Sequence, residues 1–105
     1  ENLHTIHKAL QGLLAAPPTE PDGRTERWLL QILQSYTQTP ALECDVLRLL
    51  AHFCSLGRGE ALGALGLVEL TVQLMGDWPE HKGLIQEGVR LLLALSLLPA
   101  NRVRL

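Results

Sequence analysis

The chain has 105 residues, of which 47% are apolar and 19% charged, and its formal net charge at pH 7 is −2. That length is typical of one domain, and the charge balance shows no basic excess of the kind that nucleic-acid-binding proteins carry. Leucine dominates the apolar residues, whereas Val, Ile and aromatic residues are scarce, so the composition favours helices over sheets. Polar side chains interrupt every apolar stretch, and we therefore expect no membrane span.

Apolar residues recur at three- and four-residue steps along most of the chain, the spacing that places them on one face of a helix. Pro17 and Pro18 end the first helix because a proline ring cannot donate a hydrogen bond to it. The proline-rich segment 17–24 is the one clear loop, and Thr25 is expected to cap the helix that follows. Gly57 is expected to end the third long helix. Helices are predicted over residues 3–16, 25–36, 41–56, 58–65, 67–76 and 83–98, and a further one begins at Asn101.

The chain contains an internal repeat. Sliding it along itself by 42 residues aligns the helix predicted over 41–56 with the one predicted over 83–98. A shift of 40 also places Lys8 of the first helix on Arg48. Leucine pairs coincide easily in so leucine-rich a chain, so the charged and aromatic positions carry the comparison. The aligned pairs of that kind are Asp45 with Glu87, Arg48 with Arg90, and Tyr36 with Trp78.

A period of 42 residues lies within the ~40–47 residues of armadillo and HEAT repeats. Residues 58–98 also resemble an armadillo repeat in their order: a short helix, a junction at Gly66, a second helix and a long third helix. This resemblance implies an all-α, right-handed armadillo/HEAT-like α-solenoid segment of about two and a half repeats, which forms one domain over residues 1–105 and continues past residue 105. Two features depart from the family. The loop replaces a short first helix, and neither third helix carries the asparagine with which armadillo grooves commonly bind extended peptides.

Three cations share one position in the repeat. If the alignment holds, Lys8, Arg48 and Arg90 lie on three successive third helices, which line the concave surface of armadillo-type stacks. They would form a ladder with rungs roughly 10 Å apart, and His52 lies one turn beyond Arg48 on the same face. Guanidinium groups bind carboxylates and phosphates through paired hydrogen bonds, so such a ladder suits an acidic or phosphorylated protein segment.

The alternative for both arginines is pairing within their own helices. Asp45 precedes Arg48 by three residues, and Glu87 precedes Arg90 by three. Pairs at this spacing contribute about 0.2–0.5 kcal/mol and leave donors free for other contacts.

No catalytic, metal or cofactor site is predicted. His4 and His7 stand one helical turn apart, but two imidazoles alone do not complete a metal site. Cys44 and Cys54 would lie roughly 15 Å apart in one helix, too far for a disulfide. We expect both to be free thiols, Cys54 buried, and the compartment to be the reducing cytoplasm or nucleus.

These observations together predict a non-catalytic scaffold or adaptor that binds other proteins, with no cofactor, no membrane and no nucleic-acid partner. Two alternatives remain open at this point. One is a closed helical bundle of the death-domain-like adaptor class, and the other is a regulatory helical domain attached to an enzyme such as a kinase. The repeat distinguishes the closed bundle from a solenoid, since a closed bundle needs no repetition at 42 residues. A closed bundle should also bury the apolar faces at its two ends.

Overall fold

The computed structural model describes residues 3–16, 19, 23–35 and 38–97. These residues form helices and no strand, which confirms the predicted all-helical class. None of the described helices is both long and apolar enough to cross a membrane. The elements are α1 (Leu3–Ala15), α2 (Gly23–Ser35), α3 (Pro40–Phe53), the π-helical turn η1 (Cys54–Arg58), α4 (Gly59–Ala64), α5 (Leu67–Asp77) and α6 (Lys82–Ser96).

The predicted boundaries hold to within a few residues, with one correction. α2 begins at Gly23, so Thr25 lies inside the helix instead of capping it, and the last two residues of the predicted loop 17–24 belong to the helix. Gly57 ends the long third helix as predicted: α3 passes into η1 with helical backbone, and Gly57 then adopts φ 93°, a conformation that residues with a Cβ rarely take. Most of the loop, Leu98 and the helix expected from Asn101 lie outside the described residues.

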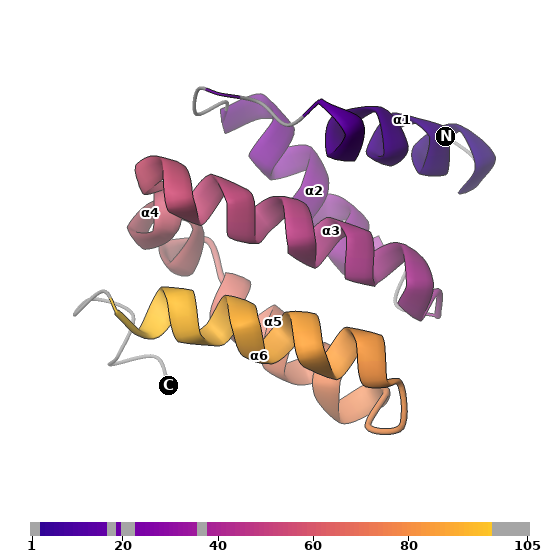
Figure 1. The fold of residues 1–105 in the computed structure, drawn as a ribbon. Coiled ribbons are helices and arrows are strands. Elements are labelled where there is room, and N and C mark those ends of the chain that lie inside the picture. Colours follow the sequence, from indigo (N-terminus) through magenta and orange to yellow (C-terminus); the bar gives the residue numbers. More distant parts are fainter. Residues whose placement is uncertain (1–2, 17–18, 20–22, 36–37, 98–105) are drawn as a thin grey trace.

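The helices are arranged in two layers (Figure 1). α1, α3 and α6 lie side by side in one layer, where α3 packs against both of its neighbours. α2 and α5 lie behind them: α2 packs on α3, α5 packs on α6, and α2 also contacts α5. The hairpin formed by α5 and α6 is therefore stacked on the hairpin formed by α2 and α3. The short α4 connects the two hairpins and packs against η1, α5 and α6.

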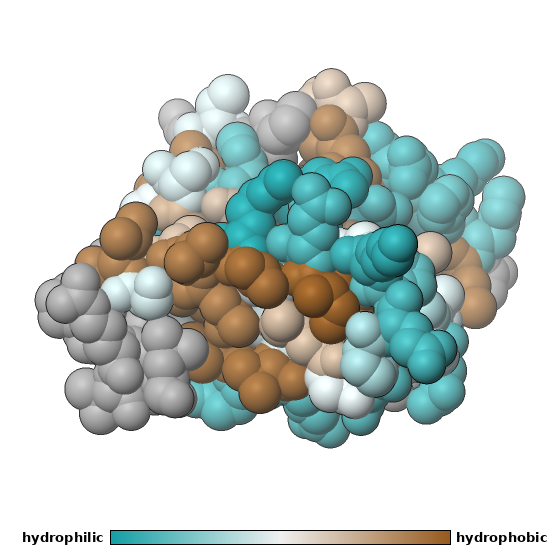
Figure 2. All heavy atoms as spheres, turned by 60° about the horizontal axis from the view of Figure 1, so that its bottom comes forward, coloured by the Kyte–Doolittle hydropathy of each residue, from teal (hydrophilic) through white to brown (hydrophobic). Residues whose placement is uncertain are grey.

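One side of the molecule exposes apolar side chains that do not contribute to the core. Figure 2 shows a continuous hydrophobic area on the side of α5 and α6 that faces away from α3. On α6 and its C-cap residue, Val89, Leu93 and Leu97 are exposed to 44%, 63% and 73%. They follow one another at four-residue steps and so form a single stripe along the helix. On α5, Val72 is exposed to 52%.

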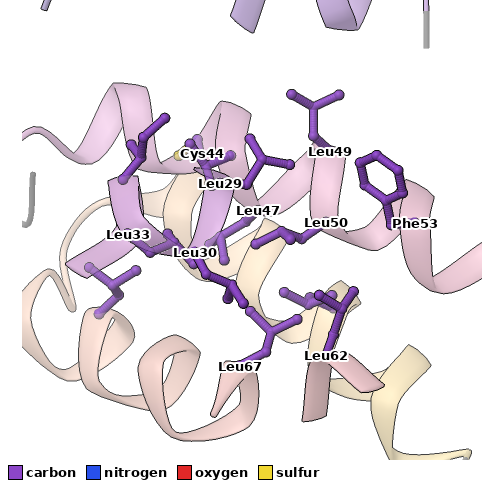
Figure 3. Packing of buried hydrophobic residues seen from close by; sticks show 14 of the residues in the cluster. Leu29, Leu30, Leu33, Cys44, Leu47, Leu49, Leu50, Phe53, Leu62 and Leu67 are labelled. Atoms are coloured by element: carbon purple, nitrogen blue, oxygen red, sulfur yellow. The ribbon is translucent and has the colours of Figure 1, made fainter. Parts of the chain in front are cut away.

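The core is built mainly from leucine on α2, α3 and the α4–α5 junction (Figure 3). α3 is the central helix because it packs against α1, α2 and α6, and residues on most of its circumference are buried. Four acidic or hydroxyl side chains are also buried among the apolar ones, and two of them lie in α3 or its contact with α6. These four are Glu26, Glu43, Thr71 and Glu87.

The close packing of α5 on α6 depends on Gly88. A Cβ added to Gly88 would lie 2.7 Å from Sδ and 2.9 Å from Cγ of Met75. Gly88→Ala is expected to lower the free energy of unfolding by about 1 kcal/mol, because this overlap outweighs the better helix propensity of alanine. In a Met75→Ala background the same substitution should instead raise it by about 1 kcal/mol. Urea unfolding of the four proteins measures both effects, and stabilisation by Gly88→Ala in the parent chain would contradict them.

Candidate protein-interaction surface

Two of the four residues predicted to form the cationic ladder meet at one carboxylate. Nε of Arg48 on α3 donates to Oε2 of Glu87 on α6 at 3.2 Å, and Nη1 of Arg90 lies 3.2 Å from the other oxygen, Oε1. The Glu87 side chain is only 7% exposed, so its charge lies close to the protein interior between the two guanidinium groups. The side chains of Arg48 and Arg90 are therefore joined through the carboxylate of Glu87.

The network extends to α1 through Asp45. Nη1 of Arg48 lies 3.7 Å from Oδ1 of Asp45, and Nε2 of Gln11 donates to Oδ2 of Asp45 at 3.3 Å. Both intrahelical pairs considered in the sequence are thus present, Asp45 with Arg48 and Glu87 with Arg90. The bond from Arg48 to Glu87 across 39 residues was not predicted, and it links the two hairpins.

The charges of this network cancel, because two carboxylates face two guanidinium groups. It is therefore not a cationic patch in the sense expected from the ladder. The side chains of Arg48 and Arg90 remain 54% and 62% exposed, and each guanidinium carries five N–H donors. The surface between α3 and α6 consequently offers hydrogen-bond donors to an incoming acceptor while the network itself has no net charge.

The other two predicted ladder residues are placed differently. Lys8 is exposed on α1, and no ion pair joins it to an acid in the part of the chain that the structure describes. His52 is half-buried near the end of α3, where its ring stands edge-on to the ring of Phe53 with centroids 6.2 Å apart. The structure therefore brings Arg48 and Arg90 together without adding Lys8 to their network.

His4 and His7 line a shallow groove between α1 and the beginning of α3, which Leu42 and Asp45 also border. Over the described ranges, no three His, Cys, Asp or Glu side chains are close enough together to hold a metal ion. The groove therefore combines two imidazoles with the Leu42 side chain and the Asp45 carboxylate.

A cysteine and a histidine approach each other at the start of α6. Sγ of Cys44 lies 4.0 Å from Nδ1 of His81, but that nitrogen accepts the backbone N–H of Leu84 at 3.1 Å and so caps the helix. Burial, together with the charges of Asp45 and Glu87, raises the pKa of the Cys44 thiol. A neutral thiol beside a capping imidazole is not an activated nucleophile. The pair is structural.

Both cysteines are free, as predicted from their spacing. Cys54 was expected to be buried and is only partly so, whereas Cys44 is 8% exposed. Cys54 begins η1, where the chain leaves the regular helix. Its surroundings still raise the pKa of its thiol to about 11, chiefly by burial.

An ion pair that the sequence did not reveal joins α2 to η1. Nε of Arg58 lies 2.9 Å and 3.1 Å from the two carboxylate oxygens of Glu26. Glu26 is 1% exposed and the Arg58 side chain 36%. This pair fixes the junction after α3 against the opposite layer, so its role is in the fold and not at the surface.

Glu43 is a buried acid of a different kind. Its side chain is fully buried in the first turns of α3, and neither carboxylate oxygen has a hydrogen-bond partner within the described structure. Burial raises the pKa of Glu43 to about 8. The group is therefore mostly protonated at neutral pH, which avoids the larger cost of an isolated buried charge.

Comparisons with protein-family models, with curated proteins and with solved structures give no match to this chain.

Proposed function

We propose that this chain is a non-catalytic scaffold that binds other proteins, built as a segment of an armadillo/HEAT-like α-solenoid. The observation that carries the proposal is the stacking of the α5–α6 hairpin on the α2–α3 hairpin at the 42-residue period of the sequence. Units of this size bury their apolar faces by stacking on one another, and the stack presents an extended surface for partners.

The layer of α1, α3 and α6 is the proposed binding surface. It is the layer in which the third helix of each repeat would lie, and it carries the exposed guanidinium groups of Arg48 and Arg90. Glu87 holds both groups in place from the interior, so they lose little freedom when a ligand binds. An acidic or phosphorylated segment of another protein would accept their remaining N–H donors, with Lys8 and His52 as flanking contacts.

The rival architecture of a closed helical bundle is less well supported. A closed bundle seals its apolar faces, whereas the stripe of Val89, Leu93 and Leu97 is exposed along α6. The two free thiols, Cys44 and Cys54, agree with the proposed location in the cytoplasm or nucleus.

The test compares binding of a fluorescent 12-residue phosphoserine-containing acidic peptide to the parent chain and to the Arg48→Gln, Arg90→Gln double variant. Fluorescence anisotropy should give an affinity about tenfold weaker for the variant, because two charge-assisted contacts are lost. Glutamine is preferable to glutamate here, since a third and fourth acid beside buried Glu87 would perturb the fold as well as the surface.

Arg27→Gln is the matched control, because Arg27 is an exposed arginine on α2, in the other layer. It should bind the peptide like the parent chain, and circular dichroism should give equal helicity for all three proteins. Equal affinities of the parent and the double variant would show that the two arginines serve only the internal network.

A further inference from the structure

The exposed apolar face of α5 and α6 can be compared with its equivalent inside the molecule. The 42-residue shift relates each position of the α2–α3 hairpin to one of the α5–α6 hairpin. Many related positions are buried in both hairpins and thus belong to the common core. Such pairs are Leu42 and Leu84, Leu49 and Leu91, Phe53 and Leu95, and Ile32 and Leu74.

Other related positions differ sharply in exposure. Leu47 on α3 is fully buried, whereas its equivalent on α6, Val89, is 44% exposed. Leu30 on α2 is 6% exposed, whereas its equivalent on α5, Val72, is 52% exposed. The residues stay apolar at these positions although only the first hairpin buries them. The difference has a direct cause, because α5–α6 packs on the first hairpin and no described helix packs in the same way on the second.

The charged residues of the two hairpins are also related by the 42-residue shift. Glu87 of the second hairpin reaches back to Arg48 of the first. Arg90 is the equivalent of Arg48, and its side chain is 62% exposed beside the apolar stripe. An acid on an incoming helix, at the position equivalent to Glu87, would reach Arg90 as Glu87 reaches Arg48.

We propose that the face formed by Val72, Val89 and Leu93, with Arg90 at its edge, is the docking surface for a further helical hairpin of the same repeat type. The occupant has an apolar inner face and an acid in register with Arg90. A second copy of this chain stacked head to tail fits less well, because it would present α1, whose exposed residues include polar Thr5 and Lys8. This inference rests on the repeat architecture proposed above.

The experiment extends the chain by one repeat. A second copy of residues 59–97 is placed directly after residue 100, in place of residues 101–105, which keeps the 42-residue period. The extended chain should have a Tm about 10 °C or more above that of the parent chain, since stacking stabilises both partners at the new interface. Hydrogen exchange of the α6 amides should slow in parallel.

Leu93→Glu is made in both chains. In the parent chain it should change Tm by less than about 2 °C, because the position is exposed. In the extended chain it should remove at least half of the gain, since the charge would then be half-buried at the new contact, as the equivalent residue Ala51 is in the first hairpin. Ala9→Glu is the control, an exposed apolar position on α1 at the far side of the molecule, and it should leave the gain intact.

The inference is overturned if the extension brings no gain in Tm, or a gain that Leu93→Glu leaves intact. It is also overturned if sedimentation of the parent chain reveals a dimer that Leu93→Glu dissociates, because the face would then bind a second copy. Peptide binding through Arg48 is measured on the parent chain alone, so loss of the proposed ligand site and loss of the proposed docking face give separate results.

Discussion

Replacing Arg58 by methionine is expected to lower the free energy of unfolding by about 2–3 kcal/mol. Methionine keeps much of the length and apolar stem of arginine but leaves the carboxylate of Glu26 buried without its cation. Removal of one partner from a fully buried pair costs about 3–5 kcal/mol, and the partial exposure of Arg58 reduces that figure.

The converse substitution, Glu26→Gln, should cost less, about 1 kcal/mol, because Nε of the partly exposed Arg58 can still donate to the amide oxygen and its guanidinium stays hydrated. Combining the two should recover most of the loss, since no buried charge then lacks a partner. Urea unfolding of the four proteins at pH 7 gives the coupling free energy. Strictly additive losses would show that the pair of Glu26 and Arg58 contributes nothing beyond its separate groups.

The helices of this chain are readable from its sequence because each long helix repeats apolar residues on one face. That periodicity places α1, α3 and α6 to within a few residues. Gly57 and Gly66, both with positive φ, mark the end of the long third helix and the turn before α5. Thr25 misled the prediction because a capping residue and an interior threonine look alike in sequence. The actual start, Gly23, follows directly on a proline-rich segment.

The buried acids were missed although the sequence holds a signal for them. Glu26, Glu43 and Glu87 each lie three residues from a leucine or valine that belongs to the buried face of the same helix: Leu29, Val46 and Leu84. An acid in apolar register points to burial, and burial demands a partner or a proton. The sequence alone could not identify Arg58 or Arg48 as those partners, because they come from segments 32 and 39 residues away.

This also explains why the candidate site came out differently from the prediction. Spacing along one helix correctly paired Asp45 with Arg48 and Glu87 with Arg90. It could not reveal that Glu87 lies between two helices and draws both arginines to itself. Sequence spacing alone does not decide whether a charged residue is free to bind another protein or forms an ion pair with a neighbouring helix. Its position relative to the core decides this as well.

The second large predicted effect is that Glu43 lowers the free energy of unfolding as the pH rises. Its pKa is raised by burial from 4.5 to about 8, so between these values the folded protein keeps a proton that the unfolded chain releases. The folded state therefore binds more protons over this range, and the contribution of Glu43 to the free energy of unfolding decreases by up to about 1.4 kcal/mol per pH unit. Below pH 4.5 and above pH 8 it should level off.

Glu43→Leu should remove this dependence, and at pH 8 it should raise the free energy of unfolding relative to the parent by about 3–4 kcal/mol, as an apolar group replaces a costly acid. At pH 5 the difference should shrink to about 1 kcal/mol or less. Glu43→Gln should also remove the contribution of this position to the pH dependence of stability. This variant should be less stable than the leucine variant, because its amide is buried at a site where the carboxyl has no hydrogen-bond partner. Urea unfolding of the three proteins at pH 5, 6.5 and 8 separates Glu43 from the other titrating groups, which all three share. A parent-to-leucine difference that stayed constant over that range would mean that Glu43 is ionised in the folded protein at pH 5 and has found a partner or water there.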